Sequence, residues 1–321
     1  MSNASVTKPR PGTAPLIVLG AGGQLGRALL QTEHVGRAVI GLTSDELDVT
    51  DRQAVVSLLG ELQPALVINA AAYTAVDRAE SESANAFAVN RDGAAHVAEA
   101  CALLNAPLIH VSTDYVFDGD KASAYREEDE AAPLSVYGRS KLEGERLVRE
   151  RHARSAILRT SWLFGAAGTN FAKTIIELAR SRDTLRIVAD QLGRPTPAAD
   201  LAAALFQMSA SMLAEPALSG LFHYAGLEAV SWHGFATEIL ETAARHIGRR
   251  PRIIPITTPE YPTAARRPRN SVLDCSKIAA LGIRPRSWHP GLKQVIDRLC
   301  AEGKPHRANG SRGSVPCPIF T

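Results

Sequence analysis

Tyr137 and Lys141 are the two residues whose types and spacing point most directly to chemistry. They lie four positions apart in YGRSK, and positions i and i+4 share one face of a helix. Reduction of a ketone by hydride creates an alkoxide that must be protonated, and a free tyrosine with a pKa of about 10 is poorly matched to neutral pH. A lysine ammonium about 4 Å away contributes about 4 kcal/mol at an effective dielectric constant of about 20, which lowers that pKa by up to about three units.

This pair is weak evidence alone, because tyrosine and lysine at this spacing are common on exposed helices. The intervening residues 138–140 are expected to act mostly as a spacer. Thr113 adds a third group, because the motif HVSTDYVFDG, residues 110–119, begins as a buried strand and ends in a polar turn. Ligands of an open α/β sheet bind at the carboxyl ends of its strands, so Thr113 is placed to hydrogen-bond a substrate carbonyl.

A glycine-rich turn precedes these residues in the stretch PLIVLGAGGQLGRALL, residues 15–30. Gly20, Gly23 and Gly26 follow a short apolar run and open an apolar-periodic segment, which predicts strand, tight turn and helix. Such a turn lets the backbone approach a diphosphate, and the helix N-terminus offers free N–H groups. A plain glycine turn is the alternative, but the position favours dinucleotide binding.

The 2′ position of the cofactor is harder to predict. An NAD site usually has an acidic residue at the end of the second strand, but here that strand ends at Thr43 and Ser44, and acidic residues come just after. The two hydroxyls suit a 2′-phosphate, although no arginine is adjacent. The pattern favours NADPH with NADH as an alternative, and it places Asp48 nearer the adenine edge.

The glycine turn and the candidate catalytic residues must be positioned by strands and helices that alternate along the chain. Short apolar runs at 16–19, 38–42, 65–70, 107–112 and 156–158 are separated by helical patterns. Strands that alternate with helices predict a parallel sheet. The expected fold is therefore α/β, a Rossmann-type doubly wound parallel sheet with a smaller mixed α/β substrate-binding domain. The helical patterns cover residues 51–62, 84–104, 136–151, 170–181, 199–213 and 232–246.

The expected division of the chain follows the loss of this alternation after residue 165. The dinucleotide-binding domain comprises 15–167 with part of 187–220, and the substrate domain comprises 168–186 and 221–300. Residues 1–14 and 301–321 are polar and rich in proline or glycine, and they are expected to be a flexible and a disordered tail.

Composition narrows the class of protein. The 321 residues are 45% hydrophobic and 21% charged, with a net charge of +3 that is spread along the chain. This balance is typical of a soluble globular protein and gives no case for nucleic acid. The four cysteines show no paired spacing, and no signal peptide or membrane span is apparent. We therefore expect a cytoplasmic protein. The arginine clusters at 249–252 and 266–269 suggest either solvated loops or a pocket for an anion.

Longer motifs then bring a family resemblance into view. The sequence resembles the dTDP-4-dehydrorhamnose reductases, which are extended short-chain dehydrogenase/reductases, over about residues 15–300. The motifs that carry this resemblance are GAGGQLG, NAAAYTAVDRAE (69–80), AVNRDG (88–93), VSTDYVFDG (111–119), YGRSKLEGE (137–145), LRTSWLFG (158–165), NFAKTI (170–175), DQLGRPT (190–196) and RPRNSVLD (267–274).

The resemblance implies reduction of the 4-keto group of dTDP-4-dehydro-L-rhamnose by NAD(P)H, the last step in making a rhamnose donor for surface polysaccharide. It makes Thr113, Tyr137 and Lys141 the catalytic triad. The predicted substrate site consists of Thr113, Asp114, Tyr115, Trp162, Asn170, Arg267 and Asn270. The predicted cofactor site consists of Gly20, Gly23, Gln24, Leu25, Gly26, Thr43, Ser44, Asp48, Val49, Ala70, Ala71, Tyr73, Asn90, Tyr137 and Lys141.

Two implications of the resemblance stay open. Some members of the family bind Mg²⁺ at a dimer interface, but no matching set of carboxylates can be traced here, so no metal ligand is predicted and the protein is expected to be a monomer or a homodimer. The rival functions are a nucleotide-sugar epimerase or 4,6-dehydratase of the same fold, and a non-catalytic NADP-binding regulatory subunit. Tyr115 argues against a dehydratase, which needs an Asp-Glu pair after the threonine, and the intact triad argues against a regulatory subunit.

Overall fold

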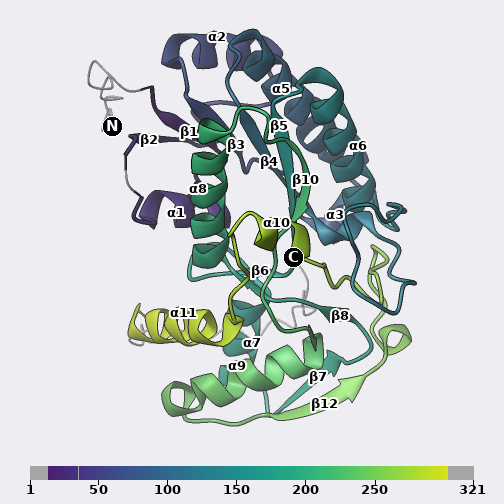
Figure 1. Cartoon of the computed structure of the whole chain (residues 1–321). Coiled ribbons are helices and arrows are strands. Elements are labelled where there is room, and N and C mark those ends of the chain that lie inside the picture. Colours follow the sequence, from purple (N-terminus) through teal and green to yellow (C-terminus); the bar gives the residue numbers. More distant parts are fainter. Residues whose placement is uncertain (1–13, 35, 303–321) are drawn as a thin grey trace.

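A computed structural model describes residues 14–34 and 36–302 of the chain. The two expected tails, 1–14 and 301–321, lie outside the described residues except at positions 14, 301 and 302. Figure 1 shows a larger lobe built on a sheet and a smaller lobe beneath it that contains mainly later parts of the chain.

The larger lobe contains a six-stranded sheet in the order β10-β5-β4-β3-β1-β2, and every neighbouring pair is parallel. The expected parallel sheet is therefore confirmed, and the strand order reverses between β1 and β3. The strands are β1 (Leu16–Leu19), β2 (Val39–Leu42), β3 (Leu66–Asn69), β4 (Leu108–Thr113), β5 (Ser155–Thr160) and β10 (Gly220–His223).

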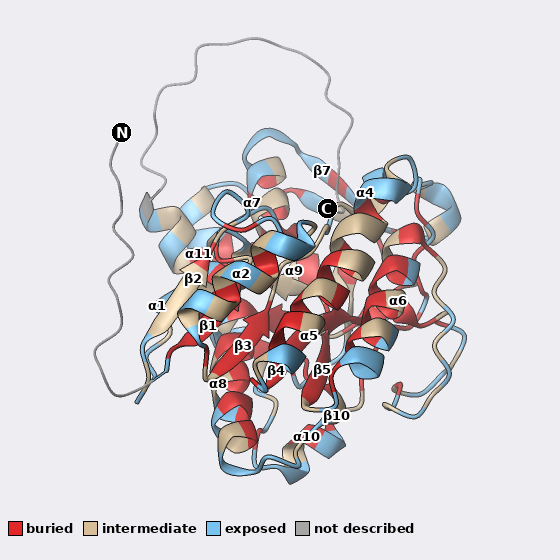
Figure 2. Cartoon of the chain, turned by 90° about the horizontal axis from the view of Figure 1, so that it is seen from above, coloured by how far each residue is buried: buried red, intermediate tan, exposed pale blue. Residues whose placement is uncertain are grey.

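Helices cover both faces of this sheet, and Figure 2 shows the buried strands beneath the row formed by α2, α5 and α6. On this face Ile17 and Leu19 pack into one apolar cluster, whereas Leu16 and Val18 pack into another on the face covered by α1 and α8. This alternation follows from the two-residue period of a strand. The helices are α1 (Gln24–Gln31), α2 (Arg52–Leu62), α3 (Val76–Ala79), α4 (Ser83–Phe87), α5 (Ala94–Leu103), α6 (Val136–Arg151) and α8 (Ala198–Ala214).

The helical pattern predicted over 84–104 is interrupted in the structure. Between α4 and α5, residues 88–93 form a wider π-helical segment that contains Asn90. Gly144 of α6 explains the fit, because a Cβ there would lie 2.0 Å from the carbonyl oxygen of Asn90. The widened turn and α6 are thus packed backbone against backbone.

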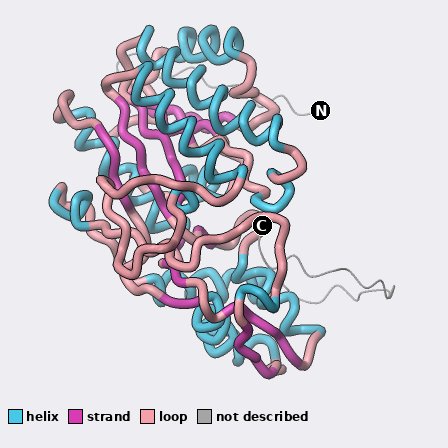
Figure 3. Tube along the Cα trace, turned by 90° about the vertical axis from the view of Figure 1, so that its right-hand side faces the viewer, coloured by secondary structure: helices cyan, strands magenta, loops and turns pink. Residues whose placement is uncertain are grey.

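The smaller lobe has its own apolar core, formed by α7 (Phe171–Ser181), α9 (Trp232–Ile247), α11 (Trp288–Glu302) and the strands beside them. Figure 3 shows this lobe joined to the larger one through several loops. Its strand pairs are β7 (Thr184–Val188) with β12 (Arg252–Ile256), β8 (Leu192–Gly193) with β11 (Val230–Ser231), and β6 (Leu163–Phe164) with β9 (Thr196–Pro197).

The expected boundary at residue 221 falls inside β10, which pairs with β5 in the large sheet. Residues 221–223 therefore do not belong to the second lobe, because the parallel sheet gains an edge strand there. The chain returns to the large lobe once more at α10 (Ser276–Ala280), where Ile278 joins the core beneath α1 and α8.

None of the helices in residues 14–34 and 36–302 combines the length and hydrophobicity needed to cross a lipid bilayer. Cys101, Cys275 and Cys300 are free thiols, and Cys317 lies beyond the described residues.

Candidate active site

A cavity of about 520 Å³ lies at the carboxyl ends of β3 and β4 and reaches into the smaller lobe. This is the edge of a doubly wound sheet at which ligands bind, beside the reversal in strand order. The cavity brings together many of the residues predicted from the sequence. These are Gly23, Gln24, Leu25, Ala70, Thr113, Asp114, Tyr115, Tyr137, Lys141, Trp162, Asn170 and Arg267.

The glycine turn forms one rim of this cavity. Gly20 follows β1 with φ +77°, and a Cβ there would lie 2.7 Å from the backbone of Ala71. Only glycine fits this conformation and this close approach of two backbones. The N–H groups at the start of α1 (Gln24–Gln31) have no side-chain cap, so they are available to an anion at the rim. This cradle fits a dinucleotide diphosphate.

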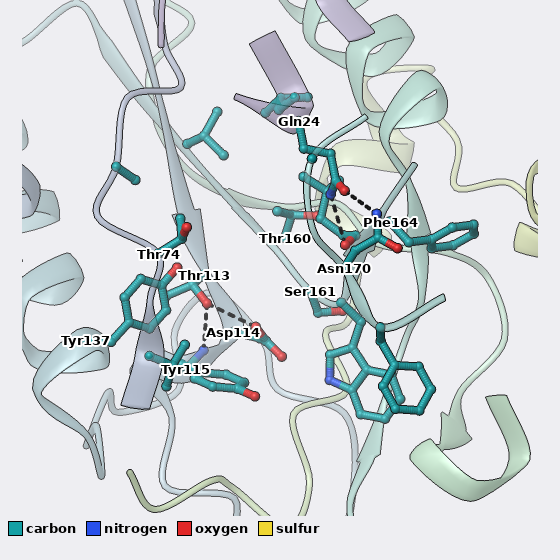
Figure 4. Close-up of a pocket in the computed structure, with 18 of the residues that line it drawn as sticks. Gln24, Thr74, Thr113, Asp114, Tyr115, Tyr137, Thr160, Ser161, Phe164 and Asn170 are labelled. Carbon is teal, nitrogen blue, oxygen red and sulfur yellow. Dashed lines mark hydrogen bonds between the residues drawn. The ribbon is translucent and has the colours of Figure 1, made fainter. Parts of the chain in front are cut away.

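Thr113 is held by its neighbours at the end of β4. Its hydroxyl donates to Oδ1 of Asp114 at 3.0 Å and accepts from the backbone N–H of Tyr115 at 3.1 Å, as the dashed lines in Figure 4 show. Burial raises the pKa of Asp114 to about 7, although several hydrogen bonds act in the opposite direction. In this arrangement the Thr113 proton is directed toward Asp114.

Tyr137 lies in the first turn of α6, and Figure 4 shows it on the opposite side of the cavity from Asn170. The Tyr115 ring meets it edge to face, with the centroids 6.0 Å apart. Gly138 allows this contact, because a Cβ there would lie 2.2 Å from the Tyr115 carbonyl oxygen. Residue 138 is therefore more than a spacer, because its lack of a side chain lets α6 pack closely against the loop after β4.

Lys141 lies one helical turn after Tyr137, as predicted, and its Nζ donates to the Val111 carbonyl at 2.7 Å. Burial raises the pKa of Tyr137 to about 12, and hydrogen bonding to Thr113 opposes this shift only in part. The expected lowering of the Tyr137 pKa by lysine is therefore not found in the protein by itself. Burial outweighs the attraction, because Lys141 is itself buried and its pKa is lowered to about 8.

Trp162 lines the cavity in a strained backbone conformation, with φ +45°. Its ring stacks on Trp232 with centroids 3.4 Å apart, and a Cβ at Gly193 would lie 2.2 Å from it. Trp162 belongs to the predicted substrate site, and one face of its ring is covered by Trp232, although the side chain still lines the cavity. Trp232 itself lines the cavity, and the sequence analysis missed it.

Gln24 and Asn170 join the rim of the glycine turn to the opposite wall. Nδ2 of Asn170 donates to Oε1 of Gln24 at 2.6 Å, and Nε2 of Gln24 donates to the Leu163 carbonyl at 3.0 Å. Asn170 also caps α7 by accepting from the N–H of Lys173. Figure 4 places both amides on the side of the cavity away from Tyr137.

Two further residues of the predicted substrate site are bound to partners within the protein. Arg267 is buried, lines the cavity and forms a bidentate ion pair with Asp77, with the closer N–O distance 2.7 Å. Asn270 is outside the cavity lining, and its Nδ2 donates to the carbonyls of Lys121 and Ser123. It therefore fixes a loop in this structure.

The second strand ends differently from the sequence-based expectation. The backbone N–H and hydroxyl of Thr43 both donate to one carboxylate oxygen of Glu46 at 2.8 Å, so an acidic group does lie at the strand tip. The turn after β2 folds back, which the linear sequence did not reveal. The other predicted cofactor residues lie outside the cavity lining; they are Gly20, Gly26, Thr43, Ser44, Asp48, Val49, Ala71, Tyr73 and Asn90.

Asn90 acts through its neighbours in this structure. Its side-chain amide pairs with both backbone groups of Tyr73, at 2.9 and 3.0 Å, and Nδ2 also donates to the Ser140 hydroxyl. It thus holds the loop after β3 against α6. In the parts of the chain that the structure describes, no group of three or more His, Cys, Asp or Glu side chains is placed to hold a metal ion.

Comparison with known proteins agrees with this geometry. Residues 14–301 match the family model described as the RmlD substrate binding domain. The dTDP-4-dehydrorhamnose reductase of Aggregatibacter actinomycetemcomitans is 46% identical over 88% of this chain and 98% of its own length, and that of Sinorhizobium fredii is 43% identical over 90% and 99%. A crystal structure of the Bacillus anthracis dTDP-4-dehydrorhamnose reductase in complex with NADP superimposes with a TM-score of 0.82, at 36% identity, and covers 89% of this chain and 100% of that one.

The match extends over nearly all of the described residues and over nearly the full length of both relatives. The sequence, the doubly wound fold and the Thr113, Tyr137 and Lys141 arrangement lead to one conclusion: the chain belongs to the dTDP-4-dehydrorhamnose reductase family of NAD(P)-dependent oxidoreductases.

Proposed function

We propose that this protein reduces the 4-keto group of dTDP-4-dehydro-L-rhamnose to dTDP-L-rhamnose, with NADPH as the hydride donor and NADH as an alternative. The observation that carries the proposal is the meeting of Thr113, Tyr137 and Lys141 in one cavity whose rim is the glycine turn. The names of relatives up to 46% identical support the choice of substrate.

The proton chemistry follows from the groups in the cavity. Bound reduced nicotinamide supplies the hydride to the carbonyl carbon. Tyr137, with a pKa of about 12, is protonated at neutral pH, and its hydroxyl donates a proton to the carbonyl oxygen as the alcohol forms. Because an alkoxide is a stronger base than a tyrosinate, this transfer is downhill. Thr113 orients the carbonyl when its hydroxyl proton turns from Asp114 to the substrate oxygen. Lys141 stabilises the remaining tyrosinate in its ammonium form, which is present below its pKa of about 8.

The proposed cofactor site follows the carboxyl edge of the sheet. The turn at Gly20, Gly23 and Gly26 holds the diphosphate, and Ala70 and Ala71 lie beside it. The NADP complex of the Bacillus anthracis relative supports NADPH. The Glu46 carboxylate at the tip of β2 argues against a strict preference, because an acidic group there suits a ribose 2′-hydroxyl better than a phosphate.

The substrate side of the proposal rests on the smaller lobe. We assign residues 168–186 and 226–300, except the return at 273–283, to substrate binding, with Tyr115 and Trp162 beside the sugar; Tyr224 and Ala225 pack in the core of the large lobe. Arg266 and Arg269 are exposed next to the cavity-lining Arg267 and are suited to a dianionic diphosphate. A cytoplasmic location and a monomer or homodimer remain part of this proposal.

The test is oxidation of NADPH and of NADH by the purified protein with the keto-sugar nucleotide, with and without EDTA. We expect turnover with both cofactors, and EDTA decides whether Mg²⁺ contributes. Tyr137→Phe should lose about 10²–10⁴ in kcat while NADPH binding survives, because the proton donor is removed and the cradle is untouched. A protein that binds NADPH without turnover, with Tyr137→Phe unchanged, would instead be a regulatory subunit.

A further inference from the structure

A row of buried polar side chains lies between β3, β4 and α6, behind the catalytic residues. Asn69 of β3 and His110 of β4 are direct partners in the register of the two strands, so their side chains share one face of the sheet. Lys141 of α6 meets them there. The exposed fractions are 1% for Asn69, 0% for His110 and 2% for Lys141, so these groups must satisfy one another without bulk water.

The direction of the hydrogen bonds in this row is fixed at one end. The backbone N–H of Ala71 can only donate, and it donates to Oδ1 of Asn69 at 3.1 Å. The other end of the Asn69 amide, its NH₂ group, then faces Nδ1 of His110 at 3.2 Å. An amide nitrogen can only donate, so Nδ1 must accept. In a neutral imidazole the proton is then on Nε2.

The chain of donors ends on the catalytic lysine. Nε2 of His110 lies 3.3 Å from Nζ of Lys141. An N–H group needs an acceptor, and an ammonium has none, whereas a neutral amine accepts through its lone pair and still donates to the Val111 carbonyl. We propose that Asn69 and His110 are positioning residues that tune the protonation of Lys141, because the Nε2–H donor that they hold against Nζ favours the neutral amine and so lowers the pH at which the ammonium loses its proton. This inference deepens the proposed reductase function and rests on it.

The opposite direction of bonding has a clear structural cost. A charged Lys141 donating to Nε2 would leave the proton on Nδ1, and Asn69 would have to turn its oxygen toward His110. The Asn69 NH₂ group would then face the N–H of Ala71, and two buried donors would oppose each other. The backbone of the loop after β3 therefore selects the direction.

One charged group near Lys141 acts against this selection, but it is already bound to other partners. Glu145, one turn further on α6, favours the ammonium, but its carboxylate is already bound to Arg159 of β5 and to the Ser112 hydroxyl of β4. Tyr137, one turn earlier, is protonated at neutral pH. Burial and the nearby Lys141 hold the pKa of His110 well below its ordinary value, so His110 stays neutral while Lys141 titrates.

A direct test is the tautomer of His110 in the intact protein, measured by ¹⁵N NMR of labelled histidine rings, with His110→Gln used to assign the signal. We expect an Nε2–H tautomer that persists from about pH 6 to about pH 9. An Nδ1–H tautomer or an imidazolium would overturn the inference. This readout does not depend on turnover, so its failure is distinct from failure of the proposed function.

A second test reverses the direction of the chain. In Asn69→Asp the carboxylate accepts from both Ala71 N–H and His110 Nδ1–H, so Nε2 presents a lone pair to Lys141. We expect the alkaline limb of the kcat profile to move up by at least about one pH unit, a tenfold change in the lysine equilibrium. The matched control is Asn105→Asp, which adds the same charge at an exposed site before β4. An alkaline limb that is unmoved, or moved equally by the control, would contradict the inference. If Asn69→Asp does not fold, the tautomer decides.

Discussion

Arg159 of β5 clamps Glu145 of α6 in a buried bidentate ion pair, with N–O distances of 2.9 and 2.6 Å. Both side chains are 4% exposed, and the Ser112 hydroxyl adds a third hydrogen bond to the same carboxylate. Glu145 lies on the same helix face as Tyr137 and Lys141, eight and four positions further along. The clamp therefore fixes the register of the helix that carries Tyr137, the proposed proton donor.

Glu145→Ala should lower the free energy of unfolding by about 3–5 kcal/mol, because it leaves the Arg159 guanidinium buried without its partner. Urea denaturation measures this loss. The control is Glu143→Ala on the same helix, whose side chain is 43% exposed and lies 3.8 Å from Arg91. That change should cost less than about 1 kcal/mol. Equal losses in the two variants would mean that the clamp contributes nothing specific.

The sequence predicted the elements of this site better than their contacts. The strands and the glycine turn could be predicted because apolar runs and glycine residues are strong local signals of strands and turns. The stack of Trp162 on Trp232 joins residues 70 positions apart, and no local pattern encodes it. Likewise, the Asn69 and His110 pairing appears only when β3 and β4 are placed in register.

The pKa of Tyr137 illustrates a second limit of sequence reasoning. The spacing of Tyr137 and Lys141 predicted attraction between a cation and a tyrosinate, but it carried no information on burial. In the structure, burial dominates and raises the pKa of Tyr137 to about 12. Desolvation depends on everything packed around a group, and one stretch of sequence does not contain that information.

Because the Gln24 and Asn170 amides are hydrogen-bonded, we expect coupling between the rim proposed to bind the cofactor and the wall proposed to bind the substrate. Asn170→Asp keeps the cap on α7 but removes the N–H that Gln24 accepts. We expect it to weaken cofactor binding about threefold or more, a coupling of about 0.5–3 kcal/mol. Fluorescence titration with NADPH measures the Kd. In a Gln24→Ala background the same substitution should have little further effect, and independent effects would refute the coupling.

The buried Asp114 carboxyl is expected to make a pH-dependent contribution to the free energy of unfolding. Burial raises its pKa from 3.8 to about 7, so the folded state favours the neutral carboxyl. The stabilisation is complete below about pH 4 and is lost as the pH rises through about 7. Asp114→Asn cannot ionise and so lacks this dependence. Between pH 5 and pH 8 the unmodified protein should therefore lose about 2–3 kcal/mol of unfolding free energy relative to Asp114→Asn.

Thermal or urea unfolding at both pH values measures the difference for Asp114→Asn. Asp120→Asn is the control, because that side chain is exposed in the following loop. A constant difference between Asp114→Asn and the unmodified protein at the two pH values would mean that Asp114 is ionised throughout the range.

The Glu46 carboxylate is expected to influence the preference between NADPH and NADH. Its carboxylate accepts from the N–H and hydroxyl of Thr43 at the tip of β2, and these bonds lower its pKa, so it is charged at neutral pH. A charge there repels a 2′-phosphate by about 1 kcal/mol at about 4 Å in water, which corresponds to about fivefold in affinity. Glu46→Gln should therefore raise the ratio of kcat/KM for NADPH over NADH by about fivefold, and added salt should reduce the effect.

The control is Asp45→Asn, at the neighbouring exposed position. It should leave this ratio unchanged if the contact with Thr43 is what matters. A ratio that shifts equally in both variants would attribute the preference to net charge near the site, and a ratio that falls in Glu46→Gln would place the 2′-phosphate elsewhere.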